Sequence, residues 1–208
     1  GRGRTGKLLL GLFRFLLQAA HGGGVLGQID ALFDRGTEQG LRNYCIFHLL
    51  LDCGLRRQEV CHLQVHHLDP ERNILHIVNS KENKSRFVLV PDFLISALQE
   101  YDQRTGITSG YMLRQLRDSE CPLTSNTVKM IFQDLKISTG IDRLHAHLLR
   151  HTFAISYLIG GGNLEFLRVF LGHYDYAATK TYVAMAAQMK LLGAPVYQLD
   201  PIFFQRGY

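Results

Sequence analysis

The sequence predicts a mainly α-helical protein with one small antiparallel β-sheet or hairpin, which is an α+β fold. Apolar residues recur three and four positions apart through most of the chain, the spacing of amphipathic helices. Two β-branched runs, residues 74–78 and 87–90, flank a polar segment as the strands of a hairpin do. With 208 residues and 46% hydrophobic content, the chain is long enough to bury a full core without disulfide bonds or metal.

Three helices are expected in the first quarter of the chain. Residues 8–20 have amphipathic spacing, and the glycines at 22–24 end that stretch. A second helix is expected over residues 24–33 and a third over residues 38–53. The third is apolar on nearly every side, which predicts a central position, and Gly54 follows its end.

A hairpin and one further helix are expected in the middle of the chain. The segment between the two strands reads SKENKSR, so the hairpin has a basic tip. Pro91 ends the second strand because it has no amide hydrogen to donate. Asp92 is a candidate cap for the helix DFLISALQEYDQRT, and residues 106–122 are expected to form a loop.

Four more helices are expected in the second half. Glycines follow the first three of them, as they follow many helix ends, and Ser125 or Thr127 lies near the start of the first. The expected stretches are TSNTVKMIFQDLKISTG, residues 147–159, LEFLRVFL after Asn163, and YAATKTYVAMAAQMKLL from about residue 175.

The composition favours a polyanionic partner and a reducing compartment. A total of 23 Lys and Arg against 18 Asp and Glu gives a formal net charge of +5 and a pI near 9.1. No run of apolar residues is long enough to cross a membrane. The cysteines form no CxxC pair, so we expect buried free thiols, no metal site and a cytoplasmic location. They are Cys45, Cys53, Cys61 and Cys121.

The segment HLLRHTF, residues 147–153, gathers basic side chains on one face of an expected helix. His147 lies three residues before Arg150 and four before His151, so the three are neighbours on that face. Taken alone, such a trio is more often structural: the histidines satisfy backbone groups and the arginine pairs with a carboxylate. A functional interpretation needs partners elsewhere in the chain.

Candidate partners lie in three other segments. GLRRQEV puts Arg56 just after a buried helix with Glu59 three residues on, where the carboxylate either orients the guanidinium or forms a plain surface ion pair. His173 follows a helix-ending glycine in LGH. Tyr182 comes nine residues later, and a lone tyrosine at helical spacing is usually part of the core.

Five segments in this order resemble the catalytic domain of the tyrosine recombinases, also called the phage integrase family. They are GLRRQEV, SKENKSR, HLLRHTFA, LGH and TKTYV, and the resemblance covers residues from about 25 to about 190. It implies the fold of that domain and a site-specific DNA recombinase or integrase. Such an enzyme cleaves and rejoins strands through a 3′-phosphotyrosyl intermediate without metal, ATP or another cofactor.

The resemblance implies that Arg56 and Arg150 bind the scissile phosphate and that Tyr182 is the nucleophile. Two guanidinium groups, permanently charged, can meet the negative charge that develops on the phosphate, so no divalent cation is needed. Lys81 matches the hairpin lysine that protonates the leaving 5′-hydroxyl. Lys84 is the alternative, because the tip has no glycine on either side of Lys81.

The same resemblance assigns supporting groups around the phosphate. His147 matches the first histidine and is the candidate to take the proton of the nucleophilic tyrosine, whereas His151 is expected to support structure. His173 matches the second histidine, and Glu59 matches the acidic residue that follows the first arginine. DNA contacts are expected from Arg86 together with Arg56, Lys81, Lys84 and Arg150.

Residues outside the catalytic region have expected roles too. Residues 1–24 look like a linker or the final helix of an N-terminal core-binding domain, residues 25–190 are the catalytic domain, and residues 191–208 are a C-terminal tail. The tail either docks on a neighbouring protomer or folds back on its own chain.

Expected partners are double-stranded DNA, further copies of the chain in a tetramer on DNA, and accessory DNA-bending proteins. Nucleoid association is expected when DNA is bound.

Two other functions are compatible with parts of this pattern. A type IB topoisomerase shares the chemistry but relaxes supercoils without exchanging partners. A non-catalytic DNA-binding regulator is the other alternative, because NLEFLRVFLGHYDYAATKTY can pass for a helix-turn-helix. A binding module has no need of a tyrosine at position 182, which argues against the regulator.

Overall fold

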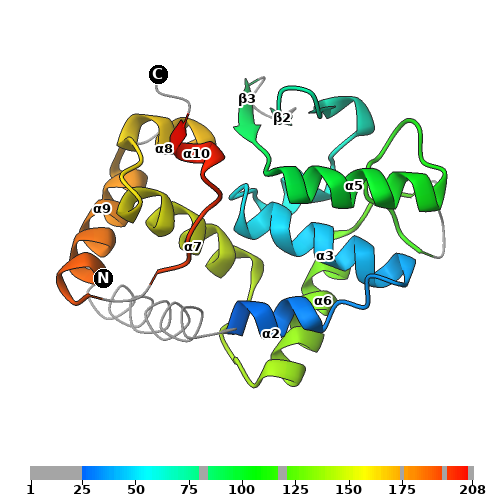
Figure 1. Cartoon of the computed structure of the whole chain (residues 1–208), viewed down its shortest axis with the longest axis horizontal. Coiled ribbons are helices and arrows are strands. Elements are labelled where there is room, and N and C mark those ends of the chain that lie inside the picture. The colour runs from blue at the N-terminus through cyan, green and yellow to red at the C-terminus, as the bar shows by residue number, and fades with distance from the viewer. Residues whose placement is uncertain (1–24, 80–83, 117–120, 174–175, 194–195, 206–208) are drawn as a thin grey trace.

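The computed structural model describes residues 25–79, 84–116, 121–173, 176–193 and 196–205, and it confirms a mainly helical fold with a small antiparallel sheet (Figure 1). The expected helix over residues 8–20 lies outside the described residues. The helices are α2 (Val25–Ala31), α3 (Glu38–Leu51), α4 (Arg57–Cys61), α5 (Asp92–Thr105), α6 (Ser125–Thr139), α7 (Ala146–Ile159), α8 (Leu164–Leu171), α9 (Tyr176–Leu191) and α10 (Ile202–Gln205).

The sheet has three antiparallel strands in the order β1-β2-β3. A one-turn 3-10 helix, η1 (Val65–His67), leads into β1 (Leu68–Asp69), and β2 (Ile74–Asn79) and β3 (Lys84–Leu89) follow. The register pairs Ile74 with Leu89 and His76 with Phe87. The sequence pattern predicted the hairpin but missed β1 and the start of β3, because the residues that open β3 are polar and have no β-branched pattern.

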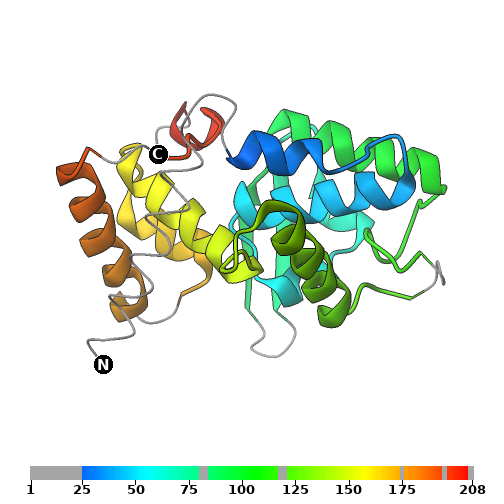
Figure 2. The same cartoon turned by 90° about the horizontal axis from the view of Figure 1, so that it is seen from below.

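Helix α3 occupies the centre of the molecule, as its apolar composition predicts. It packs against α5 on one side and α7 on the other, and Leu41, Ile46 and Leu49 are completely buried. In both views α9 and α5 lie at opposite ends of the molecule, with α7 between α9 and the group formed by α3 and α5 (Figures 1 and 2). Burial of this apolar surface is the main force that holds the helices together.

The helix ends follow ordinary capping chemistry with two departures from expectation. The Thr124 hydroxyl, rather than Ser125 or Thr127, accepts the capping hydrogen bond that starts α6, at 3.0 Å from the Thr127 amide. Asp92 is the first residue of α5 rather than its cap, and its carboxylate accepts a hydrogen bond from the Asn73 side chain.

The C-terminal segment, residues 196–205, folds back on its own chain. The Tyr197 hydroxyl donates a 2.6 Å hydrogen bond to Asp52, immediately after α3. The ring of Phe203 lies edge-on to Phe153 of α7, with ring centres 5.4 Å apart. Whether residues 191–208 dock on a neighbouring protomer stays a prediction.

The free cysteines Cys45, Cys53 and Cys61 are buried as predicted, and Cys121 is half-buried. Burial raises the pKa of the Cys61 thiol to about 11, so this thiol is protonated at neutral pH. Within the described residues, no helix combines the length and apolar character needed to span a membrane.

Candidate active site

Four segments of the chain meet in one region, with α7 at its centre. Arg56 lies just before α4, His147 and Arg150 lie on α7, His173 follows α8, and Tyr182 lies on α9. Helix α7 packs against α3, α8 and α9, so each of these segments reaches the same region. The structure therefore brings together five of the six residues that the resemblance assigned to catalysis.

Arg150 lies at the centre of this region and is only 2% exposed. Its guanidinium donates to the Gly54 carbonyl at 2.5 Å and to the carbonyl of Leu171. Burial, followed by the charge of Arg56, lowers the pKa of Arg150 to about 9, so the group is still charged at neutral pH. Neutral carbonyls hold the side chain in place and leave its positive charge to act on an incoming anion.

Gly54 shows why the turn before the first arginine needs a glycine. Its backbone is in the left-handed region, with φ +62, and a Cβ at this position would lie 2.5 Å from the ring of Phe153. The turn thereby brings its carbonyl to Arg150 and carries the chain directly to Arg56.

Arg56 and Glu59 form a closed pair at the start of α4. The Arg56 amide donates to Glu59 Oε2 at 2.7 Å, and Arg56 Nη1 donates to Oε1 at 3.0 Å. Arg56 Nη2 donates to the Gly172 carbonyl at 2.9 Å, while the side chain stays 37% exposed. Glu59 is only 11% exposed, so the pair is not the surface ion pair that the sequence left open.

Glu59 stays ionised although it is largely buried. Burial acts to raise the pKa of its carboxyl, but hydrogen bonds and charge from Arg86, with further help from Arg56 and Arg150, lower it below the ordinary value. Arg86 makes a bidentate pair with this carboxylate, at 2.7 Å and 2.8 Å. The structure thus turns Arg86 inward, and a direct DNA contact by this residue would require these bonds to break.

The hydroxyl of Tyr182 lies next to a histidine that was not the expected one. Tyr182 is 5% exposed, and its hydroxyl oxygen is 2.7 Å from Nδ1 of His151. The ring of His147 lies edge-on to that of His151, with centres 4.8 Å apart. Burial raises the pKa of Tyr182, partly offset by the charges of Arg150 and Arg56, so the phenol is protonated in this state.

The second histidine connects the tyrosine to the buried arginine. The ring of His173 is stacked on that of Tyr182, with centres 6.1 Å apart and an angle of 12° between the planes. His173 Nε2 is 3.4 Å from Nη2 of Arg150, and its Nδ1 is 3.1 Å from the hydroxyl of Thr179, which is fully buried. Thr179 was not identified from the sequence, because a threonine three residues before a tyrosine carries no distinctive signal.

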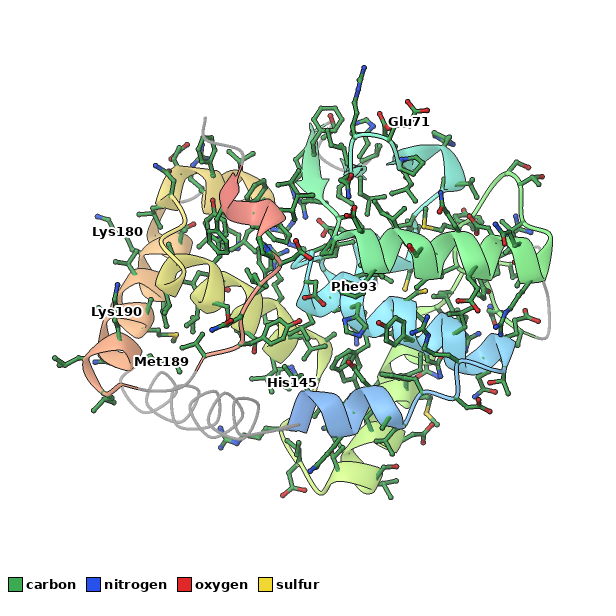
Figure 3. All side chains as sticks on the ribbon, in the orientation of Figure 1. Glu71, Phe93, His145, Lys180, Met189 and Lys190 are labelled. Carbon is green, nitrogen blue, oxygen red and sulfur yellow. The ribbon has the colours of Figure 1, made fainter. Side chains whose placement is uncertain are left out.

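The histidines of this region are neutral at pH 7. Burial and neighbouring positive charges lower the pKa of His151 and of His173 to about 4 in each case, and they lower the pKa of His147 in the same direction. A neutral imidazole can accept a proton. His145, at the start of α7 in Figure 3, has a structural use instead, because its Nδ1 accepts a 3.1 Å hydrogen bond from the Leu148 amide.

The hairpin lysines are not part of this geometry. Lys81 lies outside the described residues. Lys84 is the first residue of β3 and pairs with Asn79, and its side chain is not described. The choice between the two lysines therefore stays a prediction. Among the described residues, no group of three or more His, Cys, Asp or Glu side chains is arranged to hold a metal ion.

Comparisons with known proteins agree with this architecture. A model of the phage integrase family matches residues 27–189. Tyrosine recombinase XerA of Thermococcus onnurineus (strain NA1) is 30% identical over 148 residues, which are 71% of this chain and 52% of that relative. The chain spans about half the length of the curated relatives it matches.

Solved structures extend the likeness to three dimensions. The crystal structure of XerA recombinase matches with a TM-score of 0.67 and 27% identity, over 82% of this chain and 64% of that chain. A post-cleavage complex of XerH site-specific recombinase with palindromic difH substrate shares the fold, with a TM-score of 0.66 at 18% identity, over 90% of this chain and 51% of that one. Because the family model covers most of the sequence and the fold agrees, the chain belongs to the phage integrase family of tyrosine recombinases.

Proposed function

We propose that the chain is the catalytic part of a site-specific DNA recombinase that cleaves and rejoins strands through a 3′-phosphotyrosyl intermediate. The observation that carries the proposal is the position of the Tyr182 hydroxyl. It lies 2.7 Å from a neutral imidazole, and the charges of Arg150 and Arg56 both act on it. A tyrosine that only packs in the core does not need a hydrogen-bonded base and nearby positive charges, whereas a tyrosine nucleophile needs both.

Arg56 and Arg150 bind the non-bridging oxygens of the scissile phosphate in this proposal. Their fixed positive charges stabilise the additional negative charge that develops as the tyrosine oxygen attacks phosphorus. His173 hydrogen-bonds the same phosphate from the side of the tyrosine ring. Because two guanidinium groups supply this stabilisation, the reaction needs no cofactor.

The proton of Tyr182 passes to Nδ1 of His151, as the phosphorus–oxygen bond to the tyrosine forms. This proposal replaces His147 as the first acceptor, because His151 is the residue in contact with the hydroxyl. The negative charge of a bound phosphate raises the pKa of a nearby imidazole, which makes His151 a better acceptor when DNA is present. The ring of His147 lies edge-on to that of His151, and in this proposal His147 contacts the phosphate instead.

The bond between phosphorus and the 5′-oxygen breaks in the same step. The leaving oxygen takes a proton from Lys81, with Lys84 as the alternative donor. In the reverse direction a 5′-hydroxyl attacks the phosphotyrosine and the strand is resealed. Each of the two steps exchanges one phosphodiester bond for another, so no ATP is needed.

The proposed substrate is double-stranded DNA carrying a recombination site. The net charge of +5 and the fold shared with XerH bound to palindromic difH substrate support this.

Exchange between two duplexes requires four cleaving protomers, so we propose a homotetramer on DNA, assisted by accessory DNA-bending proteins. We further propose that residues 1–24 complete or join an N-terminal core-binding domain and that the tail after residue 190 docks on a neighbouring protomer once the tetramer forms. We expect the protein in the cytoplasm, associated with the nucleoid when it is bound to DNA.

Sequencing the DNA that becomes covalently attached to the protein in cells tests this function. A recombinase yields one short sequence in most recovered fragments, with protein on the 3′ phosphate. Incubating two labelled duplexes of that sequence with the protein should then give exchanged products. Relaxation of supercoils without exchanged products would support a type IB topoisomerase, and no covalent DNA at all would support the DNA-binding regulator.

A further inference from the structure

Arg86 of β3 is a buried cation that faces the inside of the protein. Its side chain is 8% exposed, and its Nε donates to the Phe170 carbonyl at 2.6 Å, near the end of α8. Its two terminal nitrogens donate to the two oxygens of Glu59 on α4. One side chain thereby joins the sheet to both segments that hold the first catalytic arginine.

Glu59 is shared by two arginines that differ in exposure. Arg56 is 37% exposed and reaches one carboxylate oxygen with its side chain, whereas Arg86 is buried and covers both oxygens. The bidentate pair with Arg86 compensates the negative charge of Glu59 from the buried side. The positive charge of Arg56 is then left for an anion that approaches from the exposed side.

Gly172 brings the two guanidinium groups against the same turn. Its carbonyl accepts the hydrogen bond from Arg56, and its backbone is in the left-handed region with φ +59. A Cβ at this position would lie 3.2 Å from Nη1 of Arg86 and 3.3 Å from Nη1 of Arg56. The two side chains therefore both line this turn, and the Nη1 atoms of both donate to the same oxygen of Glu59.

We propose that Arg86 is a positioning residue that holds Glu59 and the end of α8 so that Arg56 keeps both its place and its charge for the scissile phosphate. Arg86 touches neither DNA nor the reacting atoms. This inference rests on the proposed recombinase function, and it replaces the expected DNA contact of Arg86 by an indirect role.

The test measures single-turnover formation of the covalent adduct at saturating protein, on nicked duplexes of the sequence recovered from cells. Arg86→Met keeps the alkyl chain and removes the cation, and we expect an adduct rate lower by about 10²-fold, the loss typical of a misplaced catalytic group. Arg86→Lys keeps the charge without the bidentate geometry and should recover part of that loss. Arg72→Met, an exposed arginine next to the same sheet, serves as the control and should react at the wild-type rate.

Two further readouts separate positioning from a DNA contact. The slope of log Kd against log salt concentration should be unchanged in Arg86→Met, and the double variant Arg56→Ala/Arg86→Met should be no slower than Arg56→Ala alone. A slope reduced by about one, or losses that multiply in the double variant, would mean that Arg86 binds a phosphate itself and would overturn the proposal. A wild-type rate in Arg86→Met would overturn it as well.

A crystal structure of Arg86→Met gives a readout that does not depend on activity. We expect the Arg56 guanidinium to leave the Gly172 carbonyl, and an Arg56 that keeps both this bond and the bond to Glu59 would contradict the proposal. If the wild-type chain forms no adduct, the proposed function fails, and this structure alone decides the role of Arg86. If the unpaired Glu59 prevents folding, the variant Arg86→Met/Glu59→Gln removes both buried charges and is used for the same measurements.

Discussion

Nδ1 of His151 lies 2.7 Å from the hydroxyl oxygen of Tyr182, and this contact joins α7 to α9. The histidine that touches the proposed nucleophile is therefore the one that directly follows Arg150, rather than the one that opens the HLLRHTF segment. Because burial and neighbouring charges lower the pKa of His151 to about 4, its imidazole is neutral and able to accept a proton over the whole neutral range.

His151→Ala should change both the rate and the pH dependence of adduct formation. We expect a rate lower by roughly 10²–10⁴-fold, the usual contribution of a positioned base. In the wild type the rate should fall on the acid side of neutrality, where His151 gains a proton, and the bound phosphate should place this fall above the pKa of about 4 of the DNA-free protein. Above that fall the rate should be flat. In the variant the phenol must lose its proton without help, and burial raises its pKa, so the rate should rise steadily with pH. His147→Ala provides the comparison: a flat profile is expected there, and a rising one would return the role of base to His147.

Gly172→Ala should impair catalysis far more than its effect on stability suggests. Both Gly172 and Gly140 follow a helix in the left-handed conformation, with φ +59 and +67, so alanine at either position should cost about 1 kcal/mol. A Cβ at Gly140 meets no atom within 4 Å, whereas one at Gly172 crowds Arg56 and Arg86. Urea titrations should give similar losses for the two variants, and only Gly172→Ala should slow adduct formation. Equal rates for both variants would show that the turn does not position the arginines.

Much of the fold could be predicted from the sequence, because helical spacing and capping residues act locally. The central position of α3 follows from its apolar composition, and a glycine follows α6 and α8 as expected. Helix α4 and strand β1 could not be predicted in this way. Each is too short to show a period, and they exist because neighbouring elements hold them.

The residues that meet at the candidate site could be predicted only as a set. Their order along the chain resembles that of a known family, but their contacts depend on how α7, α8 and α9 pack. His147 and His151 lie on the same face of one helix, so the sequence cannot say which of them meets a tyrosine on α9. Arg86 likewise looks like a surface cation at the base of a basic hairpin tip, and only the position of Glu59 turns it inward.

The pH dependence of stability should show opposite slopes on the two sides of neutrality. His151 and His173 have pKa values of about 4 in the folded state against about 6.5 in the unfolded chain, so their contribution is complete above pH 6.5 and is lost as the pH falls towards 4. Burial alone would lower the pKa of His48, but Asp30 and Asp52 raise it to about 9. Its contribution is therefore complete below pH 6.5 and is lost as the pH rises through 9.

Urea unfolding measured between pH 4 and pH 10 tests these slopes. His48→Gln should remove most of the decline between pH 7 and pH 8.5, which we expect to be on the order of 2 kcal/mol. Above that range the buried thiols, whose pKa values are raised by burial, add a decline of their own. His62→Gln, at an exposed position, should leave the decline in place. A decline of equal size in both variants would show that His48 and its two carboxylates do not control it.

Tyr197→Phe should loosen the C-terminal segment from α3. The hydroxyl of Tyr197 donates a 2.6 Å hydrogen bond to Asp52, a buried carboxylate that also lies 2.7 Å from His48. A hydrogen bond to a charged group contributes about 1.5–3 kcal/mol, so the free energy of unfolding should fall by about that amount. Tyr111→Phe, in the loop after α5, is the control for the loss of a phenol hydroxyl. Hydrogen exchange at residues 196–199 should become faster in Tyr197→Phe alone, and unchanged exchange there would contradict the role of this bond.

The central claim, that Tyr182 becomes bonded to DNA, is tested most directly by mapping the covalent adduct. The protein is incubated with a nicked duplex of the sequence trapped in cells, digested with trypsin and nuclease, and analysed by mass spectrometry. We predict a nucleotide on the peptide TYVAMAAQMK, residues 181–190, and no adduct in Tyr182→Phe, which should still bind the duplex with wild-type affinity. An adduct that persists in Tyr182→Phe, or that maps to another tyrosine such as Tyr174, would contradict the account.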